Sequence, residues 1–168
     1  MSQTSSNSKL VQGYTKAFVD SKVEADPTFS PQLLTNRGNQ KVLTAIEKEL
    51  KSCDDLFISV AFITMGGIAP LLGTLKDLEK KGVRGRILTS DYLMFSEPRA
   101  LDKLDSLKNL DLRVFKTGQN EVGFHTKGYM FHNNGDLRII VGSSNLTQYL
   151  FRTIPVQHSG DTRSLFCE

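Results

Sequence analysis

Two kinds of spacing between apolar residues alternate along the middle of the chain. Val42, Ile46 and Leu50 recur at helical spacing, and Asn39 stands where it can cap the helix that they predict. The following segment, 56–63, is a nearly continuous apolar run, as expected for a strand covered on both faces. The pattern therefore predicts a helix followed by a buried strand.

The same alternation continues as far as residue 115. Leucines at helical spacing predict helices over 70–81 and 98–107, and the segments that follow these helices, 84–89 and 112–115, are predicted to be strands. Gly82 stands just beyond the first of these helices, where glycine is favoured as a left-handed cap. Strands separated by helices of this length pair in parallel through right-handed crossovers, with the helices on the sheet faces.

A tight turn joins the next two predicted strands. These strands span 123–131 and 137–141, and Asn134-Gly135 between them is a strong hairpin signal. Because hairpin strands are antiparallel, the predicted sheet is mixed. The predicted fold class is α/β, with a mixed, mainly parallel sheet flanked by helices.

The two ends of the chain lack this regular pattern. Residues 1–31 contain a Ser-rich and Asn-rich start and turn-favouring Asp-Pro and Ser-Pro pairs, so we predict a loosely packed N-terminal arm. Residues 32–148 form the predicted domain. Residues 149–168 show no sustained helical or alternating pattern, which predicts an irregular tail.

Charge and composition place few limits on function. The formal net charge is +3, which permits an anionic substrate but does not establish nucleic-acid binding. The Lys and Arg residues between 76 and 86 could follow a nucleic-acid backbone, although a solvated surface is the interpretation we favour. The two cysteines, Cys53 and Cys167, have no paired spacing and predict neither a disulfide framework nor a zinc site. No apolar run approaches the ~18 residues of a membrane span, and no secretory signal is evident, so we predict a soluble, cytoplasmic protein.

Candidate chemistry gathers around the predicted hairpin. The side-chain period of two places His125 and Lys127 on one face of its first strand. The second strand leads into residues 142–145, with the sequence Gly-Ser-Ser-Asn, where small residues let a phosphate approach the backbone and Asn145 offers an amide donor. The two segments are predicted to meet across the hairpin.

These two segments together resemble a known pair of motifs. His125-Thr126-Lys127 followed by Gly-Ser-Ser-Asn resembles the HxK and GSxN elements of the phospholipase D superfamily. The order of elements over 39–147 is similar to that of the phospholipase D-like domains in bacterial restriction endonucleases and helicase-like proteins. Such domains continue with a helix and another strand, so the resemblance implies that the C-terminal part of the fold is missing from this chain. The resemblance implies a phosphodiesterase in which one histidine attacks phosphorus and a second protonates the leaving oxygen, without a metal or other cofactor.

The resemblance also implies roles for individual residues. His125 matches the nucleophile, while Lys127 and Asn145 would hold the non-bridging oxygens as charge develops. Because the mechanism uses two histidines and the chain has one HxK motif, a homodimer or a second phospholipase D-like half is expected. The expected partner is DNA, which is the substrate. The chain is expected to be a metal-independent nuclease that forms a module or fragment of a restriction or helicase system. The predicted substrate-binding residues are Gly142, Ser143 and Ser144.

In an alternative interpretation, the chain keeps the fold and the phosphate-binding residues but does not catalyse a reaction. The aspartate that many members place five residues after the lysine corresponds to His132, so the chain would act as a catalytically inactive nucleic-acid-binding or assembly module. His132 has the opposite strand parity to His125, which favours a solvated turn residue over a metal ligand. Gly66-Gly67 could form the rim of the site or a plain turn. Lipid hydrolysis is disfavoured because no amphipathic membrane-binding segment is evident.

Overall fold

The chain divides into two compact units in the computed structural model, which describes residues 2–36, 40–119 and 123–148. The first unit spans Met1–Thr35 and the second spans Asn36–Glu168. All buried apolar side chains that the structure describes lie in the second unit, from Val42 onward. The predicted irregular tail, 149–168, lies outside the described residues.

The first unit is a helix followed by a short turn. The helix α1 (Ser2–Phe18) precedes the 3-10 helix η1 (Pro27–Phe29), which Asp26 caps through its side-chain oxygen. The ammonium of Lys9 on α1 lies over the ring of Phe29, 5.9 Å from its centroid. Side-chain contacts therefore join α1 to η1 within this unit.

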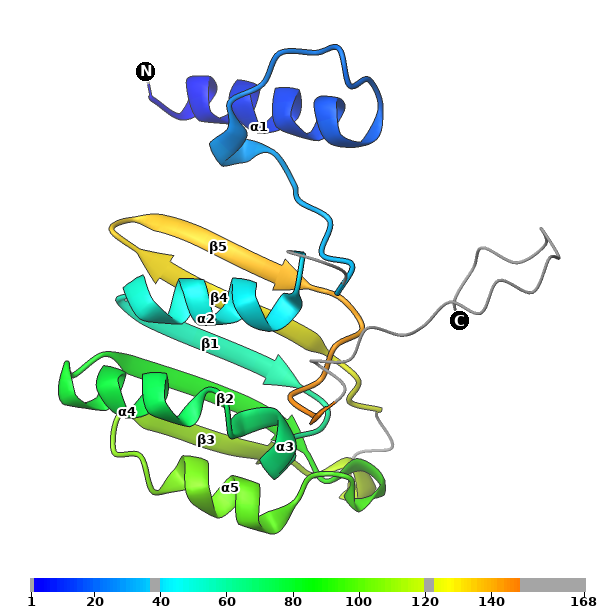
Figure 1. Ribbon diagram of the computed structural model, residues 1–168. Helices are drawn as coiled ribbons and strands as arrows, with labels where there is room; N and C mark the ends of the chain where they lie inside the picture. Colours follow the sequence, from blue (N-terminus) through cyan, green and yellow to red (C-terminus); the bar gives the residue numbers. More distant parts are fainter. Residues whose placement is uncertain (1, 37–39, 120–122, 149–168) are drawn as a thin grey trace, which may run out of the picture. The chain divides into compact units, whose positions relative to one another are not determined.

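The second unit is built on a five-stranded mixed sheet with the order β3-β2-β1-β4-β5, as Figure 1 shows. The first three strands pair in parallel, and β4 pairs antiparallel with both β1 and β5. The strands are β1 (Asp55–Val60), β2 (Arg84–Ser90), β3 (Leu110–Phe115), β4 (Lys127–Asn133) and β5 (Asp136–Val141). The predicted α/β fold with a mixed sheet is confirmed.

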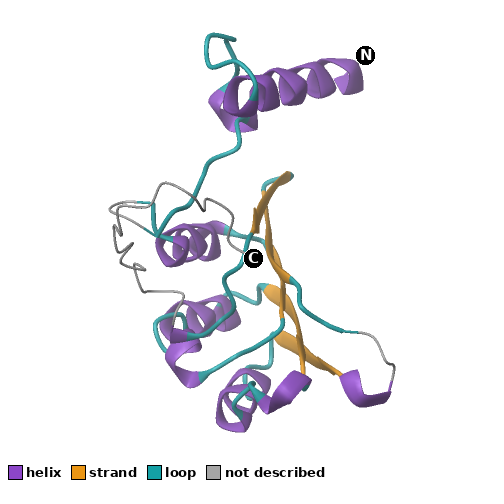
Figure 2. Cartoon of the chain, turned by 90° about the vertical axis from the view of Figure 1, so that its right-hand side faces the viewer, coloured by secondary structure: helices purple, strands orange, loops and turns teal. Residues whose placement is uncertain are grey.

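The helix that precedes β1 and the helices that connect the parallel strands lie on one face of this sheet, which Figure 2 shows nearly edge-on. These helices are α2 (Val42–Ser52), α3 (Met65–Ile68), α4 (Leu72–Lys80) and α5 (Pro98–Asp105). On the opposite face, Ile139 and Val141 of β5 are 55% and 76% exposed. Within the described residues of this unit, the α-helices therefore cover one sheet face rather than both. None of the helices in the described part of the chain is long and apolar enough to cross a bilayer.

Helix starts differ from the predicted ones for local reasons. α2 begins at Val42, whose amide donates to the side-chain oxygen of Asn36 over 2.9 Å. The predicted cap, Asn39, lies outside the described residues. The helix predicted from Pro70 begins at Leu72, because the chain first forms the separate short helix α3.

Two predicted glycine-dependent turns are confirmed. Gly82 follows α4 with a φ of 71°, in the left-handed region that glycine adopts without strain. Asn134 and Gly135 have φ values of 49° and 88° and form the hairpin turn between Asn133 and its partner Asp136. Two successive positive φ values are typical of the tight turn that matches the twist of hairpin strands.

The first hairpin strand begins later than predicted. β4 starts at Lys127, so the prediction of a strand from Gly123 is wrong and His125 precedes the strand. The reason is that β1 ends at Val60, whose partner is Lys127, so earlier residues have no full strand beside them. Period-two alternation therefore does not place His125 and Lys127 on one face, and their relation depends on specific contacts.

The hairpin turn provides a matched test of backbone strain. Gly135→Ala should lower the free energy of unfolding by about 1–2 kcal/mol, because alanine is disfavoured in the left-handed region. Gly73→Ala in α4 is the control, since nothing lies within 4 Å of the added methyl group, and it should be neutral or stabilising by up to about 1 kcal/mol. Urea unfolding measures both changes. Equal effects from the two substitutions would contradict the turn geometry.

Candidate active site

Three segments that are distant in the sequence meet where β1 ends. They are 61–64 after β1, 124–127 at the start of β4, and 142–147 after β5. Figure 1 shows the last segment, in orange, running past the end of β1. Ile63 and Leu146 form an isolated parallel bridge, so the segment after β5 pairs with the extension of β1.

Asn145 is held by the backbone of the segment that follows β1. Its Oδ1 accepts hydrogen bonds from the amides of Ala61, over 3.1 Å, and Phe62, over 3.3 Å. The Ala61 amide also donates to the carbonyl of Thr126 over 3.0 Å, which places the Asn145 carboxamide beside the His-Thr-Lys segment. Because Oδ1 serves the backbone, the amide nitrogen is the part of the Asn145 side chain suited to donate to a ligand.

His125 lies on the aromatic side of the same junction. Its ring contacts the ring of Phe62, with 6.0 Å between centroids and an interplanar angle of 64°. Phe62 thus touches His125 through its ring and Asn145 through its amide. The His125 residue is exposed, so a phosphodiester can approach it from solvent.

Lys127 is the first residue of β4, and its side chain contacts His125. Its Nζ donates to the carbonyl oxygen of His125 over 2.9 Å. Partial burial lowers the pKa of Lys127 from its ordinary value, because desolvation disfavours the charged form. A phosphate placed next to this ammonium would favour the charged form, so we expect anion binding and protonation of Lys127 to be coupled.

A buried tyrosine holds the Gly-Ser-Ser segment. Tyr129 is 1% exposed, and its hydroxyl donates to the carbonyl of Ser144 over 2.7 Å. Burial raises the pKa of Tyr129, which keeps the hydroxyl protonated as a donor. The amide of Gly142 donates to the carbonyl of Lys127 over 3.3 Å, while Ser143 is exposed. The serine hydroxyls are therefore better suited than the Gly142 amide to contact a substrate.

Gly66-Gly67 has a structural role that sequence reasoning missed. Both glycines lie within α3, so the interpretation as a plain turn is wrong. A Cβ atom at Gly67 would clash with the backbone carbonyl of Leu146, which means that α3 packs directly on the segment carrying Asn145. The adjacent glycines were the signal for such a close backbone approach.

His132 lies away from this junction. It is exposed beside the hairpin turn, and its Nδ1 lies 3.7 Å from Oδ2 of Asp55, the first residue of β1. In the described part of the chain, no three His, Cys, Asp or Glu side chains gather into a group that could hold a metal. Of the three histidines, His158 lies outside the described residues, so the described structure supplies one imidazole, that of His125, to the junction.

Comparisons with known proteins assign the chain to no family. No family model matches the sequence, and no curated protein matches it. The phospholipase D resemblance therefore depends on the motifs at 125–127 and 142–145 and on the order of elements in the sequence.

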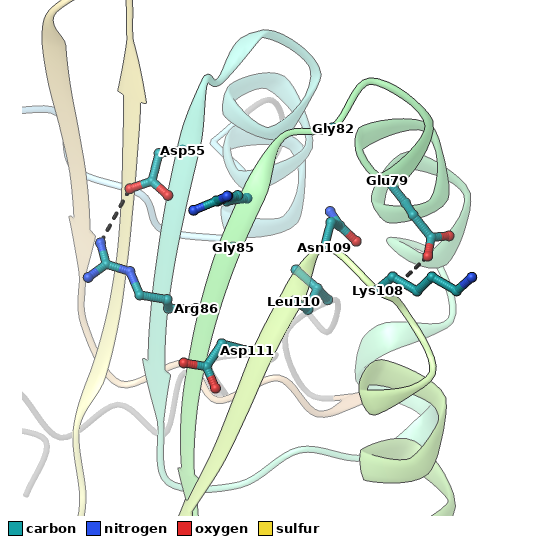
Figure 3. A pocket seen from close by; sticks show the side chains of 10 residues that line it. Asp55, Glu79, Gly82, Gly85, Arg86, Lys108, Asn109, Leu110 and Asp111 are labelled. Atoms are coloured by element: carbon teal, nitrogen blue, oxygen red, sulfur yellow. Dashed lines mark hydrogen bonds and ion pairs between the residues drawn. The ribbon is translucent and has the colours of Figure 1, made fainter.

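A separate open hollow of about 760 Å³ lies at the other end of the parallel strands, where β1, β2 and β3 begin (Figure 3). It contains an ion pair between lining residues, in which Nη2 of Arg86 lies 3.3 Å from Oδ2 of Asp55. Oε1 of Glu79 accepts a hydrogen bond from the backbone amide of Lys108 over 2.7 Å. β1, which is about 17 Å long, runs from Asp55 in this hollow to the end of the sheet where His125 lies. The hollow is therefore not part of the candidate active site.

The orientation of the Asn145 carboxamide can be tested by two substitutions. Asn145→Ala removes the acceptor for the Phe62 amide and should lower the free energy of unfolding by about 1–2 kcal/mol. Asn145→Asp keeps an acceptor at this position and should lower it less, while its added negative charge weakens binding of inorganic phosphate. Urea unfolding and phosphate titration measure the two effects. Equal destabilisation by both variants would show that Oδ1 does not accept these bonds.

Proposed function

We propose that this chain is a phosphodiesterase that cleaves DNA without a metal, through a phosphohistidine formed on His125. The observation that carries the proposal is the convergence of three chemically suited groups where β1 ends. Lys127 bonds to the carbonyl of His125, the ring of His125 contacts Phe62, and the amide of Phe62 bonds to Asn145. The ammonium is thereby linked to His125 through the His125 backbone, and the carboxamide is linked to the imidazole through Phe62.

Each of these groups has a role in displacement at phosphorus. A nitrogen of the neutral His125 imidazole attacks phosphorus, and the bond from phosphorus to the leaving oxygen breaks as an acid protonates that oxygen. The Lys127 ammonium and the Asn145 amide nitrogen stabilise the charge on the non-bridging oxygens. Water then attacks the phosphohistidine, gives up a proton to a base, and releases His125.

The acid in the first step is a second histidine, which we propose comes from another polypeptide. The described residues supply one histidine to the junction, and His132 is engaged near Asp55 at the other end of β4. A twofold homodimer with an isologous interface would bring two copies of His125 together. A second phospholipase D-like half on another protein would serve the same purpose.

One observation favours the second candidate, a catalytically inactive nucleic-acid-binding or assembly module. The family aspartate corresponds to His132, and none of the ion pairs or hydrogen bonds in the described structure joins a carboxylate to the His125 ring. A catalytic histidine is commonly oriented by such a partner. This candidate requires DNA binding that weakens steeply with salt and no turnover.

Histidine substitutions distinguish the two functions. Purified chain should cleave DNA in the presence of a chelator, and His125→Ala should lower the rate by about 10³-fold or more through loss of the nucleophile. His132→Ala is the matched control and should leave the rate within about twofold, because its contact with Asp55 is exposed. Cleavage that persists in His125→Ala would remove His125 from the mechanism. Binding without turnover in the unaltered chain would support the inactive module.

Mixing experiments test the need for two histidines. When unaltered chain is mixed with excess His125→Ala chain, each heterodimer contains one His125, which can act as the nucleophile. It lacks the second histidine, which would act as the acid and the base. The rate per unaltered chain should therefore fall well below its value without the variant. Light scattering of the same samples reports the molecular mass. Full activity from a strict monomer would contradict the proposed dimer.

A further inference from the structure

A loop beside His125 presents large apolar side chains to solvent. The 3-10 helix η2 (Tyr92–Met94) follows β2, and residues 92–95 form what we call the exposed loop. The exposed fractions are 39% for Tyr92, 62% for Leu93, 81% for Met94 and 55% for Phe95. A contiguous apolar group of this kind often marks a binding surface, because exposing it to water costs free energy.

The exposed loop is strained and is held at both ends. Leu93 and Met94 have φ values of 51° and 56°, a conformation that costs about 1–2 kcal/mol for each non-glycine residue. Before the loop, Oδ1 of Asp91 accepts bonds of 2.8 Å from both the amide and the hydroxyl of Thr117. After the loop, the buried hydroxyl of Ser96 donates to the backbone at the end of β2 over 3.1 Å. The protein therefore maintains this exposure through anchored ends.

One ring joins the exposed loop to the candidate active site. Phe62 stacks on Tyr92, with 6.3 Å between centroids and an interplanar angle of 16°. It meets Phe95 edge-on at 5.1 Å and contacts the His125 ring at 6.0 Å. The apolar surface is thus continuous with the proposed nucleophile.

A second aromatic pair includes the residue that immediately precedes His125 in the sequence. Phe115 at the end of β3 stacks on Phe124, with 5.4 Å between ring centroids, and Phe124 immediately precedes His125. Aromatic rings therefore gather at the same end of the sheet as the Lys127 ammonium. Cationic groups that hold the backbone, together with rings on which bases stack, are the combination by which proteins bind single-stranded nucleic acids.

We infer that the exposed loop and Phe62 form a stacking platform for a base next to the phosphate at His125, so that the substrate is single-stranded or locally unpaired nucleic acid. This inference rests on the proposed function, which supplies the phosphate at His125. The covalent link from phosphate through sugar to base keeps a base near the attacked phosphorus. A paired base inside a duplex is covered by its neighbours, whereas an unpaired base can stack on a side-chain ring.

Binding of matched oligonucleotides tests the platform. The full chain carries His125→Ala so that no oligonucleotide is cleaved, and fluorescence anisotropy measures affinity at one fixed salt concentration. The probes are a single-stranded oligonucleotide, an abasic oligonucleotide of the same length, and the corresponding duplex. With the loop intact, the normal single strand should bind about 5- to 150-fold more tightly than the abasic strand, as expected for stacking of one base. It should also bind more tightly than the duplex.

Ring removal then identifies the platform. The double variant Tyr92→Leu and Phe95→Leu keeps apolar side chains but should bring the ratio of affinities for normal and abasic strands close to one. Its affinity for the abasic strand should stay within about twofold, which also shows that it is folded. The control Phe57→Leu, in β1, removes a ring that contacts Arg86 at the other end of the strand and should leave the ratio unchanged.

Two outcomes would overturn the inference in distinguishable ways. An unchanged ratio in the double variant, or tighter binding of the duplex, would reject the platform while the proposed phosphodiesterase stands. Failure of the chain to bind any of the three probes would reject the proposed function on nucleic acid and the platform with it.

Discussion

The backbone amides just beyond the end of β1 determine how the candidate site is assembled. Buried or partly buried amides require acceptors, and β1 ends at Val60, where its ladder partners stop. The Ala61 and Phe62 amides find an acceptor in the side chain of Asn145, and Ala61 also finds the carbonyl of Thr126. Satisfying these amides draws the segment after β5 and the segment before β4 to one place. The proposed placement of Lys127 and Asn145 around a phosphate is a consequence of this requirement.

Buried contacts support the polar groups that face solvent at this junction. Tyr129, fully enclosed, bonds to the carbonyl of Ser144, and Gly67 allows the backbone at Leu146 to pack directly on α3. The position of Asn145, between Ser144 and Leu146, is therefore set on both sides by packing. His125, in contrast, is exposed and oriented by its contact with Phe62. Rigid placement of the phosphate-holding amide and open access to the imidazole are both useful for displacement at phosphorus.

The two ends of the parallel strands present different surfaces to solvent. The net charge of the whole chain does not reveal this difference. At the end where β1 begins, Arg86 and Asp55 pair across neighbouring strands, so local acids offset the basic side chains. At the end where β1 finishes, Nζ of Lys127 contacts the carbonyl of His125, and partial burial lowers the pKa of Lys127. A partly desolvated cation without an acidic partner favours a nearby anion more than a cation that an acid already neutralises.

The sequence by itself predicted α2, α4, α5, the three parallel strands and the hairpin turn, because apolar periodicity and turn chemistry act between neighbouring residues. The hairpin at Asn134-Gly135 is an example, and the residues of the two motifs are among those that the structure places at the junction. Tertiary structure alone decided that β4 starts after His125. It also decided that the segment after β5 packs on Gly67, and that Phe62 contacts both the exposed loop and His125. These features depend on which strand ends lie side by side. That arrangement follows from pairing across the whole sheet, which no local pattern specifies.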